Sequence, residues 1–278
     1  MTTTAESPAA PQSEQLRALL AERRRPTPPG VWESVRATTW RSLLKIKHTP
    51  EQMFDVTMFP IIMVLLFSLM FGGAIAGSRQ EYVQYLVPGI MTMSVLLTTI
   101  YTGMTIHVDL RTGVFDRFRT LPIWRPAPLV GYLVADAFRY VVASICILGV
   151  GMLLGYRPGG GPLGVVAGVA VLLAFAFAVS WAWTALGIAA RSEKTVSSVS
   201  MAVLFPLCFL SNILVDPKTL PGWLEAVVSV SPITQTVTAV RALMDGDPQA
   251  AALAGTACYG VLFLAVFGAL SLRAYNRR

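Results

Sequence analysis

Residues 158–190, PGGGPLGVVAGVAVLLAFAFAVSWAWTALGIAA, contain no Asp, Glu, Lys or Arg. About 20 consecutive apolar residues are enough for a helix to cross the hydrocarbon core of a bilayer. A helix on the surface of a water-soluble protein needs a polar face, and this stretch has none. It therefore predicts a transmembrane helix.

Four further stretches are uncharged and exceed spanning length: 56–78, 82–108, 195–215 and 248–272. A sixth, within 127–155, is interrupted only by two charged residues, and the uncharged stretch 226–240 is too short to cross. The composition agrees, because 54% of the residues are hydrophobic, 13% are charged and the mean hydropathy is +0.61. We therefore predict an all-α membrane protein whose transmembrane domain, residues 51–278, contains six transmembrane helices.

The positions of the basic residues predict the orientation. Seventeen of the 22 Lys and Arg lie in residues 1–54, the loop 108–131, the link 191–194 and the tail from Arg273. Loops on the cytoplasmic side of a membrane carry an excess of Lys and Arg. Both termini are therefore expected in the cytoplasm, and the net charge of +7 reflects topology and attraction to anionic lipids, not binding of nucleic acid.

The chain before the first predicted span has two parts. Residues 1–30 lack the apolar core of a secretory signal peptide and are expected to form a flexible cytoplasmic tail. Residues 31–50 predict a helix with one mostly apolar face, formed by Trp32, Val35, Thr39, Leu43 and Ile46. This pattern favours an amphipathic helix at the cytoplasmic membrane surface, and a solvated basic helix is the alternative.

The loop between the second and third predicted spans contains a short amphipathic segment, GVFDRFRTLP. Gly113 frees the backbone and Pro122 ends a helix that has one apolar face, formed by Val114, Phe118 and Leu121. The opposite face is formed by Asp116, Arg119 and Thr120. A helix of two turns is marginal in water and needs support from a membrane or a protein. Its charged face suits a cleft in a soluble subunit, and an ordinary basic loop is the alternative.

A second pair of short helices is expected after the fifth predicted span. Pro221 and Pro232 suit the first position of a helix, Ser231 can cap the second helix, and Gly246 lies just past its end. Two short apolar helices predict a re-entrant hairpin in the outer leaflet, with Trp223 at the level of the lipid headgroups. A plain extracellular loop is the alternative.

Asp136 and Arg139 are the only charged residues well inside a predicted span. Their i, i+3 spacing places them on one helix face, where they can form an ion pair. A charge pair inside a membrane is a candidate functional site, although a structural role is favoured here. A proton-coupled carrier would need a titratable carboxylate without such a partner.

The residues that carry catalytic or metal chemistry in other proteins are scattered. The three cysteines have no CxxC spacing and the two histidines lack clustered partners, so neither a disulfide framework nor a metal site is expected. A membrane-embedded enzyme would need clustered acids or metal ligands, and no such cluster is evident. The chain also lacks the GxxxxGK[ST] motif that cradles nucleotide phosphates. ATP would have to be hydrolysed by a partner.

Two stretches resemble one family. In DLRTGVFDRFRTLPIWRPAPLVG, six residues match the loop of type-2 ABC exporter permeases, of which the daunorubicin-resistance permeases are the most similar: Asp109, Gly113, Arg117, Pro122, Arg125 and Gly131. Tyr132 stands where a basic residue is common in that family. Residues 205–246 resemble the family's end of the fifth helix, its Leu-Pro-x-Trp-Leu segment, its Ser-Pro turn and its distal arginine, here Arg241.

The resemblance implies a permease of the bacterial plasma membrane that pairs with a second permease copy, a homodimer being favoured, and with two copies of a separate ATPase that bind ATP and Mg. It implies that the loop helix couples to the ATPase through Asp109, Gly113, Asp116, Arg117, Phe118, Arg119, Pro122 and Arg125. The expected substrate is a hydrophobic amphipathic compound similar to an anthracycline. A polyketide or a lipid is the alternative.

Overall fold

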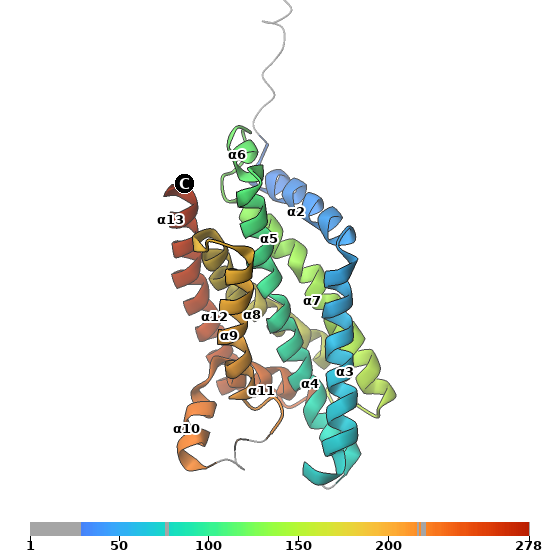
Figure 1. The fold of residues 1–278 in the computed structure, drawn as a ribbon. Coiled ribbons are helices and arrows are strands. Elements are labelled where there is room, and N and C mark those ends of the chain that lie inside the picture. Colours follow the sequence, from blue (N-terminus) through green and yellow to red (C-terminus); the bar gives the residue numbers. More distant parts are fainter. Residues whose placement is uncertain (1–28, 76–77, 216, 218–220, 278) are drawn as a thin grey trace, which may run out of the picture.

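The computed structural model describes residues 29–75, 78–215, 217 and 221–277, so nearly all of the predicted tail lies outside it. The described residues form helices joined by turns and short loops, and they contain no strand. The longest helices run side by side in an elongated bundle (Figure 1). The prediction of an all-α protein is confirmed.

Five helical stretches of the described chain are long and apolar enough to cross a membrane. They are α3 (Pro50–Ile75), α4 with α5 (Arg79–Thr98 and Ile100–Arg111), α7 (Ala127–Leu153), α8 (Gly161–Ala189), and the last helix, in which α12 (Ala250–Phe263), the π-helical segment Leu264–Gly268 and α13 (Ala269–Arg277) are continuous. These five stretches correspond to five of the six predicted spans.

The sixth predicted span, residues 195–215, is only partly helical. The helix α9 (Glu193–Phe209) has 17 residues, which at a rise of about 1.5 Å per residue gives a length of about 26 Å. The hydrocarbon core of a bilayer is about 30 Å thick. The helix ends at Phe209, because Leu210, with φ −84° and ψ 47°, leaves the helical conformation. The six-span layout is therefore not confirmed.

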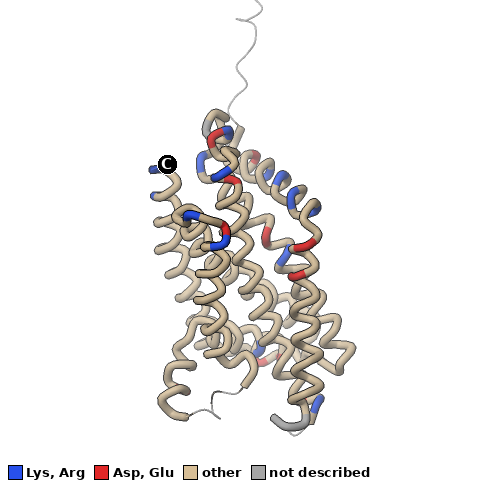
Figure 2. Tube along the Cα trace, viewed as in Figure 1, with Lys and Arg blue, Asp and Glu red and all other residues tan. Residues whose placement is uncertain are grey.

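The two ends of the bundle differ in the short helices that they carry and in the number of basic residues. The helices α2 (Val31–Lys47) and α6 (Val114–Arg119) and the end of α13 lie at one end, which we call the basic end (Figure 1). The helices α10 (Gly222–Val230) and α11 (Pro232–Asp245) lie at the opposite, hairpin end. Lys and Arg gather at the basic end and few lie at the hairpin end (Figure 2).

The helix α2 packs against α7 through small polar residues, whereas a helix on the surface of a soluble protein packs through its apolar face. Ser34, Thr38 and Ser42 are buried, and the Thr38 hydroxyl donates to Ala127 O at 2.9 Å. Thr38 lies so close to Gly131 of α7 that a Cβ atom at position 131 would clash with it. Small residues permit this close approach.

The predicted apolar face of α2 is turned away from the protein only at its first residue. Trp32 is largely exposed, Val35, Thr39 and Leu43 are half-buried, and Ile46 is buried. Trp40, which was not assigned to that face, is also largely exposed. Large exposed aromatic side chains are unfavourable in water and favourable at a membrane interface. The helix itself is as expected from the sequence, and its position at the membrane surface stays a prediction.

The two short helices near the hairpin end match the prediction only in part. The helix α10 begins at Gly222 and Pro221 is its N-cap, because Pro221 O accepts the N–H of Glu225 at 3.0 Å. The helix α11 begins at Pro232, as expected. The Ser231 side chain makes no capping hydrogen bond, and its backbone carbonyl instead accepts the N–H of Gln235.

Candidate functional site

The helix α6 begins with a sharp change of direction after α5. Gly113 has φ +71°, a left-handed conformation that glycine adopts readily. The helix ends at Arg119, earlier than the predicted Pro122, because the N–H of Thr120 donates to Arg117 O in a terminal turn. Leu121 therefore lies outside the helix and is half exposed, so its assignment to the apolar face was wrong.

Phe115 anchors α6 to the bundle. Its side chain is only 2% exposed, and its ring centroid lies 5.5 Å from that of Tyr275, 6.2 Å from that of Tyr132 and 6.0 Å from that of Phe118. These rings belong to α13, α7 and α6, and they join a small core with buried aliphatic side chains of α5, α7 and α8. The sequence analysis missed Phe115, although an aromatic pair at i, i+3 is a signal for a buried helix face.

The opposite face of α6 is polar and open. Asp116 and Arg117 are exposed, and neither takes part in the ion pairs formed by the side chains that the structure describes. Arg119 is the last residue of the helix, and its side chain lies outside the described part. Pro122 and Arg125 are exposed in the loop that follows. Next to this loop, a cleft of about 520 Å³ separates it from the end of α13.

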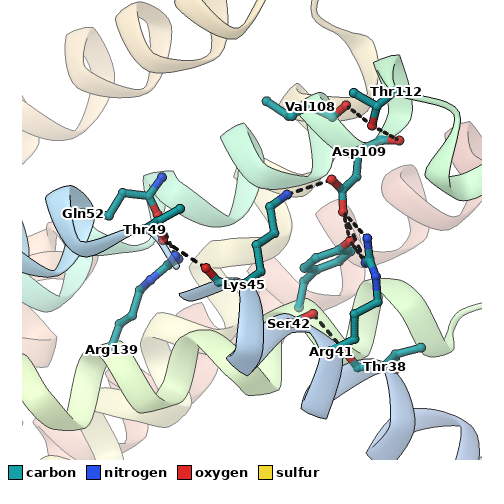
Figure 3. Close-up of polar contacts among 11 residues, drawn as sticks. Thr38, Arg41, Ser42, Lys45, Thr49, Gln52, Val108, Asp109, Thr112 and Arg139 are labelled. Carbon is teal, nitrogen blue, oxygen red and sulfur yellow. Dashed lines mark hydrogen bonds and ion pairs between the residues drawn. The ribbon is translucent and has the colours of Figure 1, made fainter. Parts of the chain in front are cut away.

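Asp109, at the end of α5, is the centre of a polar cluster (Figure 3). Its buried carboxylate accepts a hydrogen bond from Lys45 Nζ at 2.7 Å, pairs with Arg41 Nη1 at 3.4 Å and accepts the Tyr132 hydroxyl proton. Arg41 Nη1 also donates to the Tyr132 hydroxyl at 2.8 Å. These contacts tie α2, α5 and α7 together.

The Asp109 cluster also touches α6. The guanidinium of Arg41 lies 5.2 Å from the centroid of the Phe118 ring, within range of a cation–π interaction. Partial burial acts to lower the pKa of Arg41, but its contacts with Tyr132 and with the carboxylate of Asp109 outweigh it and raise the pKa above its ordinary value. Four helices thus form one connected unit at the basic end.

Asp109 and Phe118 were expected at this site from the sequence, whereas Arg41 and Lys45, two partners of Asp109, were not. Arg41 and Lys45 precede Asp109 by more than 60 residues, so no local spacing marks them. Tyr132 was noticeable in the sequence, because it stands where a basic residue is common in the family that the loop resembles. Its hydroxyl lies beside the buried carboxylate.

The predicted intramembrane pair forms a second polar cluster. Arg139 Nη1 lies 2.5 Å from Asp136 Oδ1, and both side chains are buried. Asp136 Oδ2 accepts the Thr102 hydroxyl at 2.5 Å, and Arg139 Nη2 donates to Gln52 Oε1 at 2.7 Å. The pair connects α3, α5 and α7. Figure 3 shows Arg139 and Gln52 beside the Asp109 cluster. A functional role for it stays a prediction.

The remaining predicted residues lie at the hairpin end, far from α6 (Figure 1). Trp223 is 72% exposed on α10, between Pro221 and Pro232 in the sequence. Arg241 of α11 lies 3.7 Å from the centroid of the Tyr85 ring, and its Nη2 donates to Tyr85 O at 3.0 Å and to Asn212 O at 3.3 Å. Arg241 therefore joins α11 to α4 and to the segment after α9.

These features define a polytopic α-helical membrane protein that carries a short polar helix at one end of its bundle. Residues 33–244 match the family model described as ABC-2 type transporter. The chain belongs to this family of transporter permeases.

Named relatives agree with this assignment. The chain is 43% identical to the daunorubicin resistance ABC transporter permease protein DrrB1 of Streptomyces coeruleorubidus, over 96% of this chain and 95% of the relative. It is 22% identical to the probable doxorubicin resistance ABC transporter permease protein DrrC of Mycobacterium tuberculosis (strain H37Rv), over 68% of each chain. The putative transport permease ycf38 of Cyanophora paradoxa is 23% identical over 73% of this chain and 71% of its own length.

Proposed function

We propose that this chain is the membrane subunit of an ATP-driven exporter that moves a hydrophobic amphipathic compound out of the cell. The exposed polar face of α6, held on the bundle by Phe115, is the observation that carries the proposal. The names of the relatives refer to resistance to daunorubicin and doxorubicin. We transfer that substrate class, amphipathic antibiotics with a large apolar ring system, to this chain.

ATP hydrolysis belongs to a separate subunit in this proposal. The sequence contains no GxxxxGK[ST] motif, so the ATP and Mg sites lie in a partner ATPase. Asp116 and Arg117 of α6 contact a cleft in that ATPase. Two permease copies of this chain and two ATPase copies form the complete exporter.

The proposed layout has six crossings, with α9 as the fifth. Apolar side chains that include Val203, Phe205 and Phe209 are exposed along α9, which suits contact with lipid or a second permease copy. The helices α10 and α11 form a re-entrant hairpin in the outer leaflet, with Trp223 at the headgroups. The bias of Lys and Arg toward the basic end favours cytoplasmic termini in a bacterial plasma membrane.

The contacts of α6 suggest how ATP binding moves the spans. When two ATPase subunits close on ATP, they displace α6. Phe115 transmits the displacement to α7 and α13 through its ring contacts, and Arg41 transmits it to α2 and α5 through Phe118 and Asp109. The chain is divided at Thr99, between α4 and α5, and this division lets the inner half of the span tilt.

Reconstitution in vesicles tests the proposal. The chain alone should move no daunorubicin when ATP is added, whereas the chain with its ATPase should move it only with hydrolysable ATP. A protonophore should leave this movement unchanged. Movement driven by ATP without the ATPase, or movement that stops when the proton gradient is removed, contradicts the proposal.

A further inference from the structure

A groove of about 670 Å³ lies along α2 at the basic end of the bundle. It is lined by side chains of α2 from Trp32 to Leu43 and by Val134 of α7. Small-molecule sites in proteins have volumes of about 300–1,000 Å³, so the headgroup and part of an acyl chain of a phospholipid fit a space of this size. Neither the Asp109 cluster nor the open face of α6 contributes to the lining.

The apolar part of the groove continues along α7. Trp32 and Trp40, which line the groove, are 77% and 65% exposed, and tryptophan side chains favour the level of the lipid headgroups. From Val134 onward, large apolar side chains are exposed on one face of α7, because they recur at intervals of four, three and four residues. They are Val134, Phe138, Val141 and Ile145. A hydrocarbon chain that begins in the groove therefore has an apolar surface to follow along a predicted span.

The groove also carries two opposite charges. Glu33 and Arg36 both line it, both are exposed, and their i, i+3 spacing places them on one face of α2. Within the described part of the chain, neither side chain forms an ion pair. Glu33 Oε2 accepts the N–H of Gly30 at 3.2 Å, but a carboxylate has about four acceptor sites and can take further donors. Both charges are thus open to a ligand.

These two charges match a zwitterionic headgroup. An arginine binds a phosphate through charge-assisted hydrogen bonds, and a carboxylate binds an ammonium group in the same way. An anionic headgroup without an amine, such as phosphatidylglycerol, pairs with Arg36 but meets the negative charge of Glu33. A quaternary ammonium such as choline has no N–H to donate to Glu33. A headgroup with a phosphate and a primary ammonium satisfies both side chains.

The order of the side chains along α2 agrees with the order of groups in such a lipid. The helix α2 descends from the tip of the basic end to the start of α3 (Figure 1). Glu33 precedes Arg36 by about one turn, and Trp40 and Leu43 follow nearer to α3. The ammonium, the phosphate and the acyl chain of a phospholipid follow one another in the same direction, from water toward the hydrocarbon core.

We propose that the groove between α2 and α7 binds a membrane phospholipid with a primary ammonium headgroup, which is the chemistry of phosphatidylethanolamine. Its phosphate lies on Arg36, its ammonium on Glu33, and one acyl chain along the exposed face of α7. The lipid is a resident of the permease and not the exported compound, so the inference goes beyond the proposed function. Lys45, nine positions after Arg36 and therefore on the opposite face of α2, holds Asp109 at 2.7 Å. The lipid and the Asp109 cluster thus hold α2 from two sides.

Photolabelling of the full chain in vesicles of phosphatidylethanolamine and phosphatidylglycerol tests this inference. Two probes carry the same photoactivatable acyl chain, one with an ethanolamine and one with a glycerol headgroup, and mass spectrometry identifies the labelled peptides. The ratio of ethanolamine to glycerol probe on α7 should be about threefold higher than the same ratio on α12, because an exposed ion pair contributes a small factor. Most of α12 is exposed, so its ratio reports on bulk lipid.

Three variants make the result specific. Glu33→Gln keeps an acceptor for the N–H of Gly30 but removes the negative charge, so the ratio on α7 should fall about threefold to the bulk value. Arg36→Gln should lower labelling of α7 by both probes about threefold. Glu51→Gln is the matched control, because this exposed carboxylate in the first turn of α3 does not line the groove, and it should change neither quantity.

The outcomes decide the inference without any measurement of export. If the ratio on α7 equals that on α12, or if Glu33→Gln leaves it unchanged, the inference is overturned. If neither probe labels α7 beside the groove, a photoactivatable residue in place of Val134 identifies what covers it. A cross-link to residues 1–28 or to a second copy of the chain overturns the inference as well.

Because the ratio compares two probes on one preparation, it does not depend on the amount of folded protein.

Discussion

Phe115→Ala should release α6 from the bundle without unfolding the bundle itself. Phe115 is buried among rings from α7 and α13, and truncation of a buried phenylalanine costs about 3–5 kcal/mol. A helix of six residues has almost no stability of its own in water. Phe115 is the fully buried side chain of α6, so its truncation is expected to weaken the docking of the helix most.

Hydrogen–deuterium exchange measures this release directly. A loss of about 3 kcal/mol corresponds to a decrease of about a hundredfold in the protection of the α6 amides. The same variant should fail to co-purify with the ATPase, while the exchange of α7 and α8 stays close to that of the wild-type protein. Leu121→Ala is the matched control, because Leu121 is apolar, lies in the same loop and is half exposed.

Two outcomes of the Phe115→Ala experiment would contradict this prediction. If Phe115→Ala leaves the α6 amides as protected as in the wild-type protein, Phe115 does not hold the helix. If α6 is released and the ATPase still binds with full affinity, the docked helix is not the contact surface.

Three further experiments test the polar clusters and the topology. Asp109→Asn leaves two partly exposed cations beside a neutral amide and should lower the free energy of unfolding by about 1–3 kcal/mol, visible as a lower Tm in detergent. Arg139→Gln should lower the Tm more than the double change Asp136→Asn with Arg139→Gln, because the single change leaves a buried carboxylate without its partner; equal Tm values would contradict this. In a cysteine-free background, a cysteine at Gln249 should react with an impermeant thiol reagent outside intact cells and one at Arg117 should not; the reverse labelling would contradict the orientation.

The long helices were predictable because the bilayer leaves the chain few options. Every backbone group inside a membrane needs an internal hydrogen bond, so uncharged stretches such as 158–190 have to become helices. The helix α8, Gly161–Ala189, nearly matches that stretch. The end of α9 was not predictable, because the segment after Phe209 is held by Tyr85 and Arg241, which are distant in the sequence.

The packing face of α2 illustrates a limit of hydrophobic periodicity. In water the apolar face of a helix packs against the protein, but at a membrane lipid competes for that face. Ser34, Thr38 and Ser42 pack on α7 because small side chains let the two backbones approach. A pattern of apolar residues alone does not distinguish these two environments.

The candidate site was predicted in part. Gly113 and the one-sided apolar pattern predicted the start of α6 but not its end, since these signals are local. The contacts that hold α6 are not local: Phe115 packs against Tyr275 of α13 and Tyr132 of α7, and Tyr132 in turn contacts Asp109 and Arg41. Only the folded chain brings these residues together.

Charge reversal on the open face of α6 tests whether this helix couples the permease to its ATPase. Arg117→Glu keeps Phe115 and the docked helix but reverses an exposed charge, and a damaged interface ion pair costs about 1–5 kcal/mol of binding free energy. The variant should reach the membrane, lose its ATPase during purification and lose ATP-driven efflux, whereas Arg125→Glu in the following loop should lose much less. If Arg117→Glu binds the ATPase and exports at the wild-type rate, α6 does not couple the two subunits.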